Sequence, residues 1–164
     1  MSVRAAPLSI VGLGNPDKRD DGVGIRVVEG LREELESGAW TPQGDRDLQI
    51  VSAATDIVLA ASHAAEGRWV ILVDAARMGL APGEFRMFAQ GDAKLASRVE
   101  GLSTHDADLA QILRLVDGLG MGNRVRIMGI EAQDMGDGRG LSRPLETRLP
   151  EMRTRIKEEV GLLP

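Results

Sequence analysis

Short apolar runs alternate along this chain with segments whose apolar residues recur at helical spacing. The strand-like runs are Leu8–Gly14, Leu48–Val51, Trp69–Asp74 and Val125–Ile130. The run at Trp69 is the clearest, since it is continuously apolar until it stops at an acid, and it predicts a central strand buried on both faces. Because parallel strands need helical crossovers, the alternation predicts a three-layer α/β/α fold around a mostly parallel, twisted sheet of about five strands.

Helical spacing is most regular after the first strand, where Val23, Val27, Leu31 and Leu35 recur at every fourth position. Further helices are expected over Asp56–Ala64, over the segment that follows the Ser103-x-x-Asp106 capping box and carries Leu109 to Leu119, and over Leu145–Val160. Polar and apolar residues alternate over Glu84–Phe88, which predicts a half-exposed edge strand, antiparallel to its neighbour.

Length and composition favour a single soluble domain spanning residues 1–164, with 43% hydrophobic and 27% charged residues. No stretch approaches the roughly 20 apolar residues that cross a bilayer. The apolar run near the N-terminus lacks an export-signal cleavage site, so we expect a cytoplasmic protein that does not bind membranes. A formal net charge of −5 and 2% aromatic residues disfavour nucleic-acid binding, which leaves a protein or a small molecule as the expected partner.

Four polar residues are expected at the carboxyl edge of the sheet, where open α/β sheets bind their ligands. Asp21 follows the first strand and Asp74 ends the central one; His105 opens a helix, and Glu131 ends the last strand. The chain has no cysteine, so a metal must be held by imidazole, carboxylate or carbonyl groups. Asp21, Asp74 and His105 suit a divalent ion such as nickel, zinc or manganese, with positions left open for substrate or water.

Each of these residues also has a simpler interpretation. Asp20 and Asp21 lie in a polar run that is by default a solvated loop with helix-capping duty. Asp74 could cap a turn, and His105 could be a second capping-box residue. His63, at the end of an alanine-rich segment, is expected to be a surface histidine rather than a catalytic base.

Glycines after the first strand suggest a dinucleotide-binding fingerprint but do not complete it. The pattern Gly12-x-Gly14-x-x would need a glycine where the chain has Asp17, and the lysine-containing P-loop pattern is absent from the sequence. These glycines are instead expected to allow a tight turn and a close approach of backbone to a protein segment or an ion.

The stretch Val11–Gly24 reads Gly-x-Gly-Asn, a short loop, then acid-acid-Gly-x-Gly, and it resembles the opening signature of the nickel-iron hydrogenase maturation proteases. The other blocks of that family follow in order, so the resemblance covers nearly the whole chain. They are Val73-Asp74-Ala75, Ala81-Pro82-Gly83, Ser103-Thr104-His105, Gly129-Ile130-Glu131 and Gly140-Leu141-Ser142.

The resemblance implies an aspartic-type or metal-dependent endopeptidase that removes a short C-terminal peptide from the nickel-loaded precursor of a nickel-iron hydrogenase large subunit. Asp21, Asp74 and His105 fall on the family's three metal-contacting positions and are the expected catalytic residues; either acid could be the general base. The nickel would be carried by the substrate, and zinc or cadmium could substitute for it in crystals. The free protease is expected to be a monomer.

One block departs from the family pattern, because Ala53-Ala54-Thr55 stands where the family usually has Gly-Gly-Thr or Gly-Thr. Either the turn avoids a positive φ in this chain, or the substrate approaches that loop differently. Two other functions stay open. One is a non-proteolytic, metal-sensing chaperone of a hydrogenase subunit. The other is a peptidyl-tRNA hydrolase, whose opening resembles Gly12–Pro16 but whose polyanionic substrate suits a negatively charged chain poorly.

Overall fold

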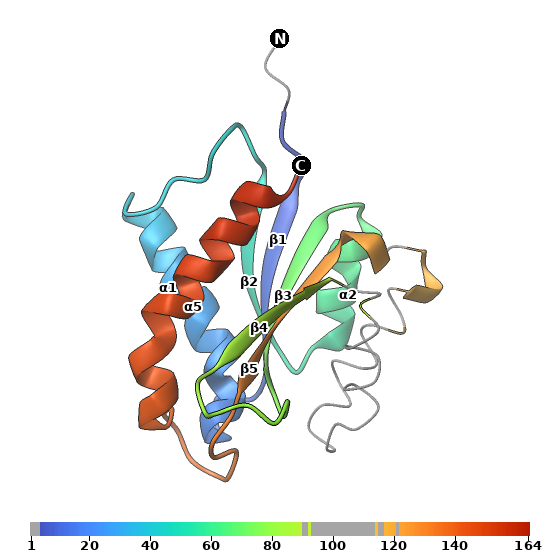
Figure 1. The fold of residues 1–164 in the computed structure, drawn as a ribbon. Coiled ribbons are helices and arrows are strands. Elements are labelled where there is room, and N and C mark those ends of the chain that lie inside the picture. The colour runs from blue at the N-terminus through green and yellow to red at the C-terminus, as the bar shows by residue number, and fades with distance from the viewer. Residues whose placement is uncertain (1–3, 90–91, 93–113, 115–116, 121) are drawn as a thin grey trace.

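The computed structural model describes residues 4–89, 92, 114, 117–120 and 122–164, which form a sheet flanked by helices (Figure 1). The strands are β1 (Leu8–Leu13), β2 (Leu48–Ala54), β3 (Trp69–Ala76), β4 (Phe85–Ala89) and β5 (Val125–Glu131). The helices are α1 (Val23–Glu36), α2 (Ile57–Ala65) and α5 (Arg143–Leu162). A short 3-10 turn, η1 (Arg19–Gly22), leads into α1, and another, η2 (Gly122–Arg124), leads into β5. The helix expected after the capping box at Ser103 lies for the most part outside the described residues.

The five strands form one mixed sheet in the order β2-β1-β3-β5-β4, with β3 at the centre as predicted. β1 pairs in parallel with β2 and β3, and β3 pairs in parallel with β5. β4 runs antiparallel along β5. The mostly parallel sheet and its antiparallel edge strand are therefore confirmed, and the carboxyl ends of four strands lie along one edge.

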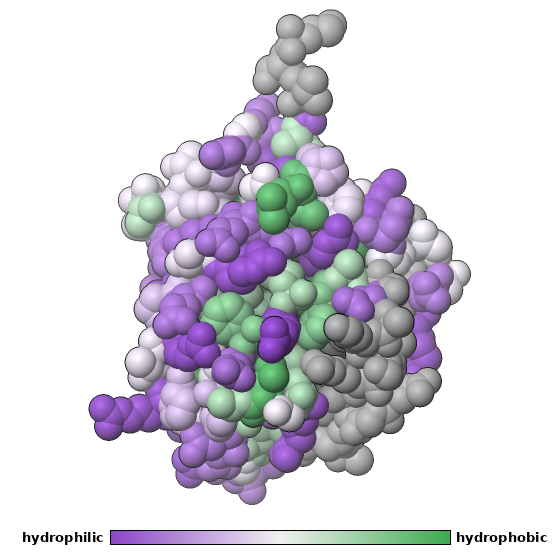
Figure 2. All heavy atoms as spheres, viewed as in Figure 1, coloured by the Kyte–Doolittle hydropathy of each residue, from purple (hydrophilic) through white to green (hydrophobic). Residues whose placement is uncertain are grey.

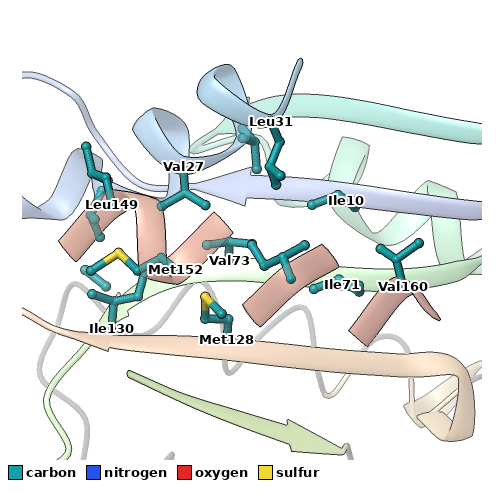
Figure 3. Packing of buried hydrophobic residues seen from close by; sticks show 14 of the residues in the cluster. Ile10, Val27, Leu31, Ile71, Val73, Met128, Ile130, Leu149, Met152 and Val160 are labelled. Atoms are coloured by element: carbon teal, nitrogen blue, oxygen red, sulfur yellow. The ribbon is translucent and has the colours of Figure 1, made fainter. Parts of the chain in front are cut away.

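Helices cover both faces of the sheet, and this explains why β3 is apolar up to Asp74. α1 and α5 lie together on one face and α2 lies on the other (Figure 1). The α1/α5 side buries Ile71, Val73, Met128, Ile130, Val27, Leu31 and Met152 (Figure 3). The α2 side buries Val70, Leu72, Ile127, Ala60 and Ala64. Successive strand residues alternate between these two cores, so no position of β3 can be polar without a partner.

The outer surface over α1 and α5 is mostly hydrophilic, whereas apolar residues show beside it over β4 (Figure 2). Within the described part of the chain, no helix combines the length and the apolar character that crossing a membrane requires.

Gly24 allows α1 to begin directly against the sheet. A Cβ at this position would lie 2.2 Å from the carbonyl oxygen of Val73 and 2.5 Å from that of Leu13. Real side chains do not tolerate such distances, so only glycine lets the first turn of α1 rest on the carboxyl ends of β1 and β3. The contact holds η1, with its two acidic residues, at the edge of the sheet.

A buried polar network lies at the opposite, amino-terminal ends of the strands. Ser9 Oγ is 2.8 Å from His63 Nδ1 and accepts a hydrogen bond of 2.8 Å from Arg68 Nε. Arg68 also donates to the carbonyl oxygen of Leu8 and to a carboxylate oxygen of Asp47. His63 is only 7% exposed, so its interpretation as a surface histidine is wrong. Its partner Ser9 is 54 positions away, which local sequence pattern does not reveal.

The burial of His63 predicts a loss of stability at mildly acidic pH. Burial is the main cause that lowers the pKa of His63 below 6.5; Glu66 opposes the shift and Arg68 adds to it. The unfolded chain therefore takes up a proton first, so this contribution to stability is present above about pH 6.5 and is lost as the pH falls through the folded pKa. We expect thermal melts to show a larger loss between about pH 7 and pH 5 for the wild type than for His63→Gln. Equal losses would contradict this assignment.

Candidate functional site

Gly14 brings two of the expected site residues, Asp21 and Asp74, to the same point. Its φ of +117° is one that side-chain-bearing residues rarely adopt. A Cβ on Gly14 would lie 1.8 Å from the carbonyl oxygen of Asp21 and 3.7 Å from Asp74 Oδ1. The loop that leaves β1 can therefore approach the Asp21 backbone and the Asp74 side chain this closely only because residue 14 is a glycine.

Asp21 is 8% exposed and is held by its own loop. The backbone N–H of Asn15 donates to Asp21 Oδ2 at 2.9 Å, and the backbone N–H of Asp21 donates to the carbonyl oxygen of Lys18 at 3.1 Å. The Asn15 side chain in turn accepts from the backbone N–H of Asp17, which closes an Asx turn. These bonds orient the Asp21 carboxylate within a compact loop and rule out the simple solvated-loop interpretation.

Asp74 is 5% exposed and lies near the end of β3, directly opposite Gly129 of β5. Its neighbours Val73 and Ala75 belong to the core under α1 and α5, so strand alternation turns Asp74 toward the α2 face. A buried carboxylate on the central strand is costly unless its surroundings compensate it, and such residues are common at functional sites.

The two other residues expected at this edge are His105 and Glu131. His105 lies outside the described residues. Glu131 is buried, and its Oε2 accepts a hydrogen bond of 2.6 Å from the backbone N–H of Met78, so it holds the loop that follows β3. Among the described residues alone, no three His, Cys, Asp or Glu side chains gather as a metal site, and the expected set includes one residue beyond them.

Asp20 holds two loops of the site together, a role that the sequence interpretation missed. It is 0% exposed rather than solvated. Asp20 Oδ2 accepts from the backbone N–H groups of Gln133 and Asp134, both at 2.9 Å, and from Ser142 Oγ at 2.7 Å. Asp20 Oδ1 accepts from the backbone N–H of Ser142 at 2.6 Å. These four donors compensate the buried charge and fasten the loop between β5 and α5 to η1.

Backbone and ion-pair contacts continue this connection along both loops. The backbone N–H of Arg19 donates to the carbonyl oxygen of Gly138 at 2.8 Å, and that of Gly138 donates to Asp17 at 2.9 Å. Ion pairs join Lys18 to Asp137 and Arg139 to Asp17. The loop that carries Asp21 and the loop after β5 therefore form one structural unit.

Ala54 keeps the backbone conformation that the family's glycine would supply. Its φ is +50°, in the left-handed region, so the possibility that this turn avoids a positive φ is wrong. The Ala54 carbonyl oxygen accepts a hydrogen bond of 3.0 Å from the backbone N–H of Gly14. This hydrogen bond ties the strained turn after β2 to the loop at Asp21.

Ala54→Gly is therefore expected to stabilise the protein slightly. Relief of left-handed strain, about 1–2 kcal/mol, exceeds the cost of extra chain freedom, about 0.5–1 kcal/mol. Urea denaturation should show a net gain of roughly 0.5–1 kcal/mol. The matched control is Ala53→Gly, which has no positive φ and loses a buried methyl group, and it should destabilise. A loss of stability in Ala54→Gly would show that no strain is stored there.

The chain is similar in sequence to proteins of hydrogenase maturation. A family model described as hydrogenase maturation protease matches residues 25–159. The chain is 26% identical over 156 residues to the hydrogenase expression/formation protein HoxM of Azotobacter vinelandii, covering 93% of this chain and 72% of that one. It is 22% identical over 136 residues to HupD of Thiocapsa roseopersicina, covering 82% of this chain and 58% of that one.

Solved structures share the fold. The hydrogenase maturation protease HybD from Thermococcus kodakarensis superposes with a TM-score of 0.70 at 23% identity, covering 94% of this chain and 99% of that one. The maturating endopeptidase HybD from E. coli gives a TM-score of 0.71 at 19% identity, covering 92% of this chain and 89% of that one.

Proposed function

Since this chain belongs to the hydrogenase maturation protease family, we propose that it removes a short C-terminal peptide from the nickel-loaded precursor of a nickel-iron hydrogenase large subunit. The single observation that carries the proposal is that the backbone of the buried Asp21 and the carboxylate of the buried Asp74 both approach Gly14 at the carboxyl edge of the sheet. The family match over residues 25–159 favours a maturation protease over a peptidyl-tRNA hydrolase.

In this proposal the nickel ion arrives with the substrate, and Asp21, Asp74 and His105 contact it. Carboxylate oxygens and an imidazole nitrogen suit nickel, and zinc or cadmium could replace it on the same donors. Peptide hydrolysis also needs a group that takes a proton from the attacking water, and a carboxylate at this point can do so. One acid can contact the ion while the other serves as base, since the backbone of Asp21 and the carboxylate of Asp74 both approach Gly14.

The partner is the precursor of a hydrogenase large subunit, met in the cytoplasm by a monomeric protease whose residues 1–164 act as one domain. Cleavage after nickel insertion makes the step an irreversible checkpoint, since a hydrolysed peptide bond does not re-form under these conditions.

The test is the intact mass of a co-encoded large-subunit precursor after incubation with the protein, with and without nickel. Loss of one fixed C-terminal peptide, only from the nickel-loaded form, is the expected result. A precursor that binds the protein but keeps its full mass would contradict the protease and favour a metal-sensing chaperone. Gel filtration with light scattering tests the monomer.

A further inference from the structure

A pocket of about 330 Å³ opens between the start of α1 and the loop after β5. Its wall runs along α1 from Gly22, the residue after Asp21, to Glu29. At 1.5 Å per residue this distance is about 10 Å. An extended peptide advances about 3.3 Å per residue, so the pocket has the length of about three residues.

Positive charge is concentrated in this pocket although the chain as a whole is acidic. The pocket is lined by Arg19, Arg26 and Arg139 against one acid, Glu29. The chain has 25 acidic and 20 basic residues, so overall composition does not account for three arginines in one pocket. We call it the arginine pocket.

The arginines keep donors available for a ligand. Their side chains are 47%, 43% and 82% exposed for Arg19, Arg26 and Arg139. Each is paired with an acid that does not line the pocket, respectively Asp134 at 3.5 Å, Glu146 at 3.1 Å and Asp17 at 2.7 Å. Exposed ion pairs of this kind are weak, and a guanidinium has five N–H donors, so an arriving carboxylate can share or displace the present partner.

Apolar groups complete the walls. Pro16, Ile25 and Leu141 line the same pocket. Apolar walls with arginine donors favour a peptide that places aliphatic groups against the protein and carboxylates toward the arginines. Hydrogen bonds from Ser142 to Asp20 hold the two walls together, because they join η1 to the residue that follows Leu141.

We infer that the arginine pocket binds an acidic stretch of the precursor within about three residues of the scissile bond. The inference rests on the proposed function, since it names the precursor segment that lies against Gly22, the residue after Asp21, during cleavage. Carboxylates would occupy the end near Arg19 and Arg26, whereas Glu29 disfavours a further acid at the far end.

The first test needs no cognate hydrogenase. A synthetic pentapeptide with two Asp residues and its twin with two Asn residues are titrated into the protein, and backbone amide NMR shifts give both dissociation constants. The wild type should bind the Asp peptide about tenfold tighter, the scale of two partly exposed charge pairs. Shifts should cluster at Gly22, Arg26 and Gly140.

Variants separate the pocket from overall charge. Arg26→Glu/Arg139→Glu should remove the preference for the Asp peptide, and Arg26→Gln/Arg139→Gln should reduce it to about twofold or less. The control is Arg86→Glu/Arg124→Glu, which makes the same change in net charge away from this pocket. Equal binding of both peptides by the wild type, or an equal loss of preference in the control variant, would overturn the inference.

Processing of the precursor then distinguishes this inference from the proposed function. For a precursor with an acidic extension, the Arg26/Arg139 charge reversal should raise KM about tenfold with kcat nearly unchanged. Cleavage by the wild type together with equal affinity for the two peptides would refute the pocket and leave the protease. A clear peptide preference without cleavage of any nickel-loaded precursor would refute the protease and leave a site for acidic peptides.

Discussion

Asp74→Asn protein is expected to process the nickel-loaded precursor at least about 100-fold more slowly than the wild type, the usual scale for losing a general base. The amide keeps the size of the carboxylate but loses its charge and its capacity to take a proton. Asp74 is buried on the central strand with its Oδ1 close to Gly14, so no solvent-exposed acid can readily replace it. The rate is measured by intact mass of the precursor over time.

The same substitution should leave the protein folded. The amide removes a buried negative charge, whose burial is costly, and functional residues are often poorly optimised for stability. The melting temperature of Asp74→Asn should therefore be equal to or above that of the wild type. Asp47→Asn is the matched control, because Asp47 pairs with Arg68 at the opposite end of the sheet, and it should keep full processing. Normal processing by Asp74→Asn would remove this residue from the mechanism.

Asp20→Ala is expected to destabilise the protein by about 3–5 kcal/mol, which is exceptional for a loop residue. The substitution leaves the backbone N–H groups of Gln133, Asp134 and Ser142 without their acceptor. Each buried donor that loses its partner costs about 1–3 kcal/mol, and entry of water recovers part of the sum. Urea denaturation followed by circular dichroism measures the change.

A graded series checks that these hydrogen bonds are the cause. Ser142→Ala removes only the hydroxyl donor to Asp20 and should cost about 1 kcal/mol. The loss of stability in Asp20→Asn should lie between those of Ser142→Ala and Asp20→Ala, because the new amide nitrogen faces a hydrogen-bond donor. If Asp20→Ala unfolds at the same urea concentration as the wild type, with the same dependence on urea, the loop after β5 is not held by this carboxylate.

The architecture could be predicted from the amino-acid sequence, because burial imposes a hydrophobic period on each strand and helix. A strand covered on both faces is apolar along its buried length, as β3 is from Val70 to Val73, and a helix on a sheet is apolar every third or fourth position, as α1 is. These patterns are local, so the order of strands and helices could be predicted, together with the antiparallel edge strand. The motif resemblance also identified the family correctly.

The different roles of Asp20 and Asp21 could be seen only in the folded structure. Successive residues of a 3-10 turn point about 120° apart, so Asp20 and Asp21 face different surroundings although the sequence presents them as equivalent. Asp20 meets donors 113 to 122 positions away, and Asp21 faces its own loop beside Gly14. His63 is similar, since its partner Ser9 lies on another element. Hydrogen bonds between distant residues leave no periodic trace in a sequence, whereas burial of apolar side chains does.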